Sequence, residues 1–255
     1  MWFQLKSYIK FLLSSRNQHG VHSPFVYRLV TKCFYDKGNK KAYQKIADYR
    51  KELFKNKETI KVEDFGKGSR VFKSDERQIS AIAKNAGISW KRSKLLYRLC
   101  TYLNSKQSIE LGTSVGLATA SLATNTNNNV LSIEACANTA AIAKKYLQKH
   151  ALKNVEIQVH KFEEILPKLQ QKYDLAYIDG NHSYEATIKN FELLLPLTHN
   201  NSIFIFDDIY WSQEMQKAWK EIQQHPEVRV TIDTFYWGLV FFRKEQAKEH
   251  FKIRV

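Results

Sequence analysis

The chain has 255 residues, of which 44% are hydrophobic and 25% are charged. This is the composition of an ordinary globular protein of one or two domains, and it excludes wholesale disorder and collagen-like architecture. No apolar run reaches the roughly 18 residues that span a bilayer. The cysteines at positions 33, 100 and 136 form neither a disulfide framework nor a metal-binding pair. We therefore expect no transmembrane segment and a cytoplasmic location.

The net charge of +15 is concentrated in the first part of the chain. Residues 1–107 contain 24 Lys and Arg against 8 Asp and Glu, whereas residues 108–255 contain 16 against 17. We therefore divide the chain near Gln107 into a basic segment, 1–107, and a second domain, 108–255. A basic segment can bind nucleic acid or an anionic membrane. No basic block alternates with aromatic residues, however, so we favour a solvated surface.

The basic segment is predicted to be a helical cap on the domain that follows. An amphipathic first helix is predicted from apolar residues at helical spacing: Trp2, Leu5, Ile9, Leu12 and Leu13. Such a stripe can touch a membrane surface, but core packing is its commoner fate. Further helices are predicted over 23–35, 40–55, 75–85 and 90–103, with a polar loop at 64–69. A homodimer through this segment remains open.

From residue 108 the sequence alternates between strands and helices. The predicted strands are 108–112, 130–135, 155–160, 173–179 and 202–208. Helices are predicted at 116–124, 138–150 with Asn138 as N-cap, 162–171, 183–195 with Ser183 as N-cap, and 212–224. Five such units in series predict a parallel, doubly wound sheet. The runs 228–234 and 238–244 lie too close together for a helix between them, so they predict a terminal antiparallel hairpin. The fold class is therefore α/β and Rossmann-like, with seven strands.

Two features predict a ligand at the carboxyl ends of the first strands. The first strand ends in Glu110-Leu-Gly112-Thr-Ser-Val-Gly116, whose glycines let the backbone approach a ligand closely. This spacing is not the tighter turn that holds a pyrophosphate. Glu134 ends the second strand, where a carboxylate can accept both hydrogen bonds of a ribose diol. The sequence thus favours a ribose-bearing ligand without a pyrophosphate over an unliganded turn beside a solvated strand end.

Residues 108–244 resemble class I S-adenosylmethionine-dependent methyltransferases. The stretches Tyr177-Ile-Asp179-Gly-Asn181-His182-Ser-Tyr184 and Phe206-Asp-Asp208 are similar to the O-methyltransferase branch, which often uses a divalent cation. The resemblance implies that Glu134 binds the ribose, that the glycine loop borders the methionine moiety and that the Phe162 region lies against adenine. The implied cofactor-binding residues are Glu110, Gly112, Thr113, Ser114, Gly116, Glu134, Ala135, Phe162 and Asp179. The chain departs from the family where an acid often follows the third strand, here His160-Lys161, and where Asp often replaces Asn181.

Carboxylates end the fourth and fifth predicted strands. If these strands are neighbours, Asp179 lies only about 5 Å from the end that carries Asp207 and Asp208. Such crowding raises a pKa unless a cation neutralises it, and hard oxygen ligands suit Mg²⁺ or a similar ion. Asp179, Asp207 and Asp208 are therefore the metal candidates. The alternative carries about equal weight: Asp207 or Asp208 caps the next helix, and Asp179 only orders a turn.

The leading functional hypothesis is methyl transfer to the oxygen of a small-molecule hydroxyl. A metal-bound hydroxyl loses its proton more easily, and Asp179 or His182 could receive that proton, so both are catalytic candidates. Tyr184, Tyr210 and Trp211 follow the same strand ends and are expected to line a planar substrate. One alternative is an RNA methyltransferase that holds RNA with the basic segment, with an affinity that falls steeply with salt. Another is a non-catalytic, cofactor-binding scaffold.

Overall fold

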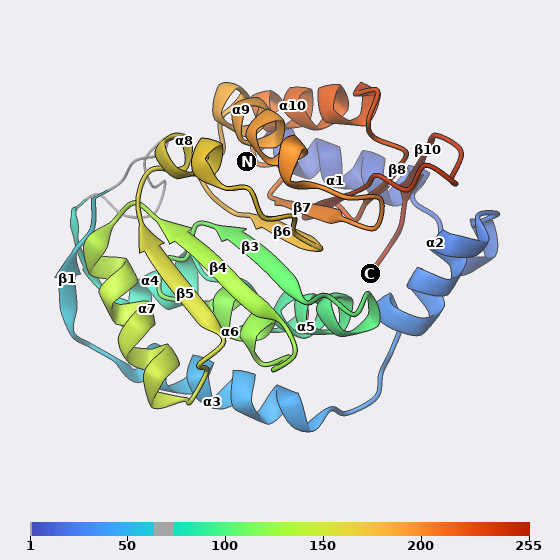
Figure 1. Ribbon diagram of the computed structural model, residues 1–255. Coiled ribbons are helices and arrows are strands. Elements are labelled where there is room, and N and C mark those ends of the chain that lie inside the picture. Colours follow the sequence, from blue (N-terminus) through green and yellow to red (C-terminus); the bar gives the residue numbers. More distant parts are fainter. Residues whose placement is uncertain (1, 64–73) are drawn as a thin grey trace. The chain divides into compact units, whose positions relative to one another are not determined.

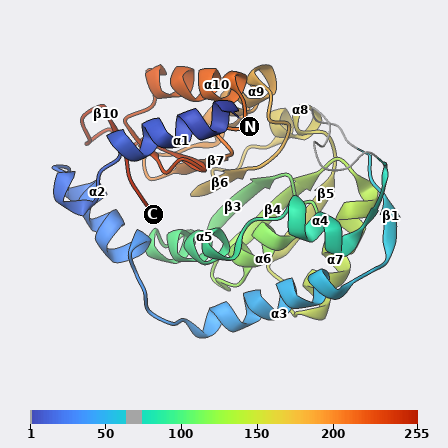
Figure 2. The same cartoon turned by 180° about the vertical axis from the view of Figure 1, so that it is seen from behind.

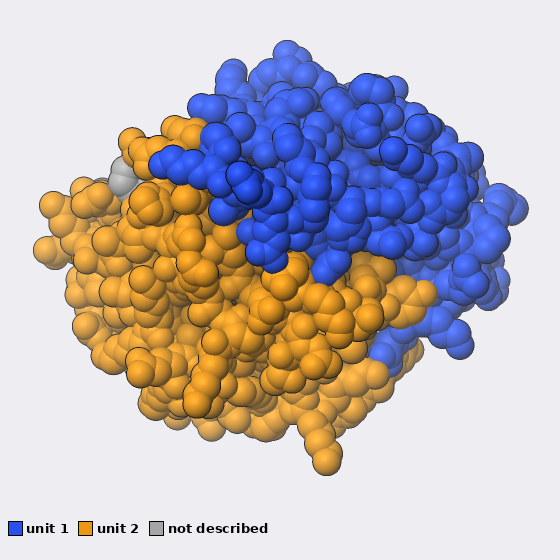
Figure 3. Space-filling model, viewed as in Figure 1, with its two compact units in different colours: residues 1–36, 166–255 blue, residues 37–165 orange. Residues whose placement is uncertain are grey.

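The computed structural model describes residues 2–63 and 74–255, and the chain forms two compact units. Unit 1 comprises residues 1–36 and 166–255, and unit 2 comprises residues 37–165 (Figure 3). The polar loop predicted at 64–69 lies outside the described residues. The change in charge near Gln107 coincides with the first residue of strand β3 (Gln107–Leu111).

In unit 2 the parallel strands β3, β4 (Asn129–Glu134) and β5 (Val155–Val159) lie side by side in that order (Figure 1). Helix α6 (Leu117–Ala123) follows β3, and α7 (Ala137–Lys149) follows β4. These β–α units confirm the predicted pattern. The prediction of Asn138 as the N-cap of α7 is wrong, because Cys136 occupies the N-cap position. Asn138 lies within the helix, and its side-chain amide donates to the carbonyl of Lys61 at 2.8 Å.

The helices predicted before β3 are confirmed in unit 2 as α3 (Lys41–Lys55), α4 (Ile79–Asn85) and α5 (Trp90–Tyr102). Both α3 and α5 pack against α6. Helix α4 begins later than predicted, because Glu76–Gln78 forms strand β2, antiparallel to β1 (Thr59–Lys61). After β5, the predicted helix over 162–171 is reduced to α8 (Phe162–Ile165) and one 3₁₀ turn, Leu166–Lys168. Pro167 in that turn lacks the N–H that a longer helix needs.

The strands of unit 1 contain the predicted hairpin. Strands β6 (Leu175–Ile178) and β7 (Ile203–Asp207) are parallel, and β9 (Trp237–Phe241) is antiparallel to both β7 and β8 (Val230–Asp233). An additional strand that the sequence did not predict, β10 (Glu249–Lys252), runs parallel to β8 at the sheet edge. Only Phe251 of β10 is buried, so its sequence lacks the apolar pattern of a strand.

Helices α9 (Tyr184–Leu194) and α10 (Gln213–Gln224) of unit 1 pack against each other. Ser183 caps α9 as predicted, and its hydroxyl accepts a hydrogen bond from the N–H of Ala186 at 3.1 Å. Ser212 caps α10 in the same way. The alternation of strands and helices in both units confirms an α/β, Rossmann-like fold with an antiparallel hairpin.

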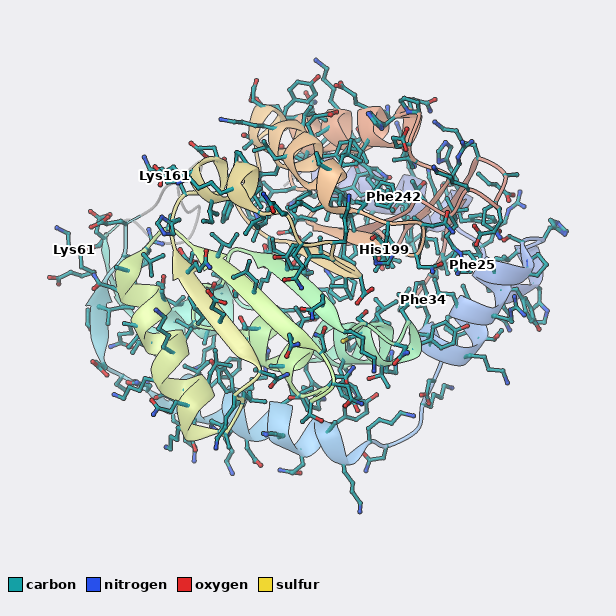
Figure 4. All side chains as sticks on the ribbon, viewed as in Figure 1. Phe25, Phe34, Lys61, Lys161, His199 and Phe242 are labelled. Carbon is teal, nitrogen blue, oxygen red and sulfur yellow. The ribbon has the colours of Figure 1, made fainter. Side chains whose placement is uncertain are left out.

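The N-terminal residues of unit 1 form helices α1 (Trp2–Ser14) and α2 (Pro24–Leu29), and α2 continues into a π turn, Val30–Phe34. Phe25 of α2, labelled in Figure 4, packs edge-on against Phe241 at a ring distance of 5.1 Å. The prediction that the apolar stripe of α1 packs in a core is wrong, because Trp2 is 73% exposed and Leu13 is 84% exposed. Across residues 2–63 and 74–255, no helix combines the length and apolar character of a membrane span.

Candidate active site

The glycine loop follows β3 in unit 2 and has an unusual backbone. Gly112, Ser114 and Gly116 have φ values of 99°, 49° and 82°, in the left-handed region that favours glycine. The Gly112 N–H donates to the carbonyl of Ile133 on β4 at 2.9 Å, which ties the loop to the neighbouring strand. The loop therefore turns sharply at the carboxyl edge of the sheet, where ligands of this fold class bind.

Glu134 and the glycine loop are in direct contact. The Glu134 carboxylate accepts the Ser114 N–H at 2.7 Å through Oε2 and the Cys136 N–H at 2.9 Å through Oε1. Two backbone donors thus fix its orientation. Glu134 is only half-buried. Its carboxylate is an acceptor group at the sheet edge, and this fits the hydroxyl donors of the ribose of S-adenosylmethionine.

The side chain of Glu110 lies inside the protein and is not part of the exposed surface of the loop. Its side chain is fully buried, and Oε2 accepts hydrogen bonds at 2.5 Å from the hydroxyls of Thr119 and Ser132. The Ser132 hydroxyl is also 2.5 Å from that of Thr113. This network connects β3, β4 and α6. Glu110 and Thr113 therefore brace the loop from inside.

A close contact requires glycine at position 116, and the sequence did not reveal this contact. A Cβ added at this position would lie 2.4 Å from the hydroxyl oxygen of Tyr49 on α3 and 3.2 Å from Cβ of Ala143. Tyr49 is fully buried and donates to the carbonyl of Val115 at 2.9 Å. The close approach at Gly116 is therefore made by the chain's own tyrosine. Nothing near Gly116 in the sequence signals this contact, because Tyr49 lies on a distant helix.

Ala135 and Phe162 lie along the same sheet edge in unit 2. Glu134 pairs with Val159, the last residue of β5, and Phe162 begins α8 shortly after it. Both Ala135 and Phe162 are half-buried, so both retain surface that a ligand can contact. Lys161, labelled in Figure 4, is exposed at the position where related proteins often carry an acid. Adenine contact through Phe162 stays a prediction.

In unit 1 the carboxylates of β6 and β7 lie at adjacent strand ends, as predicted. Ile178 pairs with Phe206, so Asp179 and Asp207 follow neighbouring positions. Asp207 is buried, and each of its oxygens accepts a hydrogen bond: 2.7 Å from the Tyr177 hydroxyl and 2.8 Å from the Asp208 N–H. Tyr177 is a partner that sequence reasoning missed. Its position two residues before Asp179, on the same strand face, was the available signal.

His182 faces Asp179 across the loop that follows β6. Its Nε2 lies 3.4 Å from Oδ1 of Asp179, and about a quarter of its side chain is exposed. Burial alone would lower the pKa of His182. The hydrogen bond to Asp179 and the negative charges of Asp179, Asp208 and Asp207 outweigh burial and raise the pKa to about 9. The imidazole is therefore protonated at neutral pH.

The predicted metal candidates do not present a ready ligand set. Among the residues that the structure describes, no group of three or more His, Cys, Asp or Glu side chains is placed to hold a metal ion. Asp207 uses both oxygens within the protein, and Asp179 faces His182. Asp207 and Asp208 do not cap α10 either, because Ser212 does. In this arrangement the carboxylates do not fit a resident cation.

The three aromatic residues expected to line a substrate have different surroundings. Tyr184 is half-buried, and its hydroxyl donates to Glu221 on α10 at 2.5 Å. Trp211 is half-buried, with its ring 6.2 Å from that of His182. Tyr210 is buried, and its hydroxyl donates to Asp233 at 2.7 Å. Trp211 therefore lies near the proposed proton acceptor, whereas Tyr210 points into the protein.

Replacing Tyr210 with phenylalanine is expected to lower stability rather than substrate affinity. The change removes the hydrogen bond to Asp233, a carboxylate that is itself buried and whose pKa burial raises. Loss of such a bond costs about 1–3 kcal/mol, which urea unfolding would measure. The KM for the methyl acceptor should not change. A raised KM with unchanged stability would instead place Tyr210 against the substrate.

The comparisons with known proteins agree with this fold. Residues 109–209 match a family described as a methyltransferase domain. No curated protein matches the chain. The fold is similar to that of the S-adenosylhomocysteine-bound Podospora anserina methyltransferase PaMTH1, with a TM-score of 0.62 and 12% identity over 88% of this chain and 97% of that chain.

Two further solved structures share the fold. The O-methyltransferase TomG from Streptomyces achromogenes, in complex with S-adenosylmethionine, has a TM-score of 0.57 and 16% identity over 86% of this chain and 95% of its own. The O-methyltransferase from Bacillus cereus, in complex with S-adenosylhomocysteine, has a TM-score of 0.53 and 15% identity over 81% of this chain and 93% of its own. Residues 109–209 thus match a methyltransferase domain, and the chain shares its fold with solved methyltransferase structures.

Proposed function

We propose that the protein is a class I S-adenosylmethionine-dependent methyltransferase, which transfers the methyl group of the cofactor to a hydroxyl oxygen of a small molecule. The observation that carries this proposal is the His182–Asp179 pair at the carboxyl end of β6, which can hold and accept a proton. Similar structures named as O-methyltransferases support the choice of oxygen as acceptor atom. A cytoplasmic location and a homodimer stay predictions.

The protein's own residues would have two tasks in this reaction. In unit 2, Glu134 would bind the ribose and the Gly112 loop would hold the methionine moiety of the cofactor. When bound, S-adenosylmethionine supplies a methyl group on a positively charged sulfur. In unit 1, Asp179 would orient His182 through Nε2, which leaves Nδ1 of the neutral imidazole to accept the hydroxyl proton. The acceptor oxygen forms the new bond to the methyl carbon, and the carbon–sulfur bond breaks with its electron pair left on sulfur.

The proposal is tested with a panel of small-molecule acceptors and labelled S-adenosylmethionine. The panel should contain phenols and catechols, matched amines and thiols of the same ring size, and an RNA sample. We expect label in an O-methyl product and equimolar S-adenosylhomocysteine, identified by mass spectrometry. Transfer only to nitrogen or sulfur acceptors would contradict the assignment of oxygen, and transfer only to RNA would replace it with the RNA alternative.

Removal of divalent cations should leave methyl transfer largely intact. The carboxylates of Asp179 and Asp207 already have partners within the protein, so no step of the proposed reaction passes through a cation. The measurement compares initial rates after dialysis against EDTA with rates after Mg²⁺ is restored. Activity that is lost on dialysis and recovered with Mg²⁺ would show that the cluster rearranges to bind an ion, as the sequence suggested.

A further inference from the structure

Helix α1 turns its larger apolar face toward solvent. Five of its residues are between 39 and 84% exposed and share one side of the helix: Trp2, Leu5, Ile9, Leu12 and Leu13. The opposite side, which contains Ser7 and Phe11, is buried. This orientation is the reverse of the usual one for a surface helix, in which the apolar stripe faces the core.

Contacts within unit 1 hold α1 in this orientation. The ring of Phe235, in the turn between β8 and β9, lies 4.8 Å from that of Tyr8 and 5.7 Å from that of Phe11. Just beyond the helix, Arg16 forms a β-bridge with Ile253. Figure 2 shows α1 in front of the other elements of unit 1. The exposed face is therefore fixed by packing on the opposite side.

A further aromatic side chain is exposed close to α1. Tyr236 is 53% exposed, and its ring lies 5.2 Å from that of Phe235, which contacts Tyr8 and Phe11 of the helix. An exposed apolar face such as that of α1 marks an interaction site on a folded protein. The charges around it indicate the partner. Residues 1–35 contain five Lys and Arg and no Asp or Glu, and Lys6 and Lys10 lie on α1 itself.

We propose that α1 binds flat on the surface of an anionic lipid bilayer. An apolar face with tryptophan and leucine, next to lysines and without acidic residues, is the pattern of an interfacial helix. The 13 residues of α1 extend about 20 Å, less than the roughly 30 Å of a bilayer core, so the helix lies along the membrane. An isologous contact with a second copy would instead bring two acid-free basic segments together.

Vesicle sedimentation with the full-length protein tests the proposal. Vesicles with about 30% anionic phospholipid should bind the protein, and vesicles of neutral phosphatidylcholine should bind it far more weakly. The double variant Ile9→Asp/Leu13→Asp should lower the partition coefficient at least about 100-fold, because two apolar anchors are lost. The variant Lys6→Gln/Lys10→Gln should lower it about 30-fold on anionic vesicles only.

Matched controls separate this surface from general charge effects. Lys144→Gln/Lys145→Gln on α7 removes the same charge from an exposed face of unit 2, and Tyr102→Asp places an acid at another exposed aromatic residue. Both should bind vesicles as the wild type does. Equal losses in these controls, or no binding to anionic vesicles at low salt, would overturn the proposal. So would a dimer, seen by sedimentation velocity, that Ile9→Asp/Leu13→Asp dissociates without any vesicle binding in the wild type.

Discussion

Replacing Glu134 with alanine is expected to weaken S-adenosylmethionine binding at least 100-fold. Each hydrogen bond to a charged acceptor contributes about 1.5–3 kcal/mol, and a ribose diol would donate two of them to this carboxylate. The variant also removes the acceptor for the Ser114 and Cys136 N–H groups, which fix the glycine loop beside β4. Isothermal titration calorimetry of the purified protein measures the change in Kd.

Two further variants sharpen the Glu134 experiment. Glu134→Gln keeps the shape but can accept at only one of its two terminal atoms, so it should bind the cofactor with an affinity between those of the wild type and the alanine variant. Glu156→Gln on β5 removes an exposed carboxylate from the same unit and should bind normally. If Glu134→Ala binds the cofactor within twofold of the wild type, the ribose role is wrong.

The cofactor loop illustrates what the sequence could and could not predict. The adjacency of Glu134 and the glycine loop followed from strand order, because parallel neighbours end at the same sheet edge. The role of Gly116 did not follow, since the small residue is required by Tyr49 on α3. Glu110 likewise matched the family pattern, but only the three-dimensional network with Thr119 and Ser132 shows that it braces the loop from inside.

The errors in the rest of the fold have a common physical origin. Periodicity identified α1 correctly, but it reports only that one face is apolar, not whether another element covers that face. Strand β10 was missed because pairing with β8 stabilises a segment with a single buried side chain, Phe251. Each error depends on a long-range contact that local sequence does not encode.

Replacing His182 with alanine is expected to lower kcat about 100-fold or more at pH 9, as loss of a general base does. In the wild type the raised pKa of about 9 keeps His182 protonated at pH 7, so only the neutral fraction can accept a proton. The wild-type rate should therefore rise with pH and level off above pH 9. In His182→Ala this rise should disappear. A variant that retains the wild-type pH profile would remove His182 from the mechanism.

Asp179→Asn distinguishes the two candidate bases. The change removes the hydrogen bond and the nearest negative charge that raise the pKa of His182, while burial continues to lower it. The neutral imidazole then forms at lower pH, so the rise in rate should move toward neutral pH. Stopped assays from pH 6 to pH 10 under saturating cofactor measure this displacement. If Asp179 is itself the base, the asparagine variant should instead lose activity across the whole range, and His182→Ala should retain part of it.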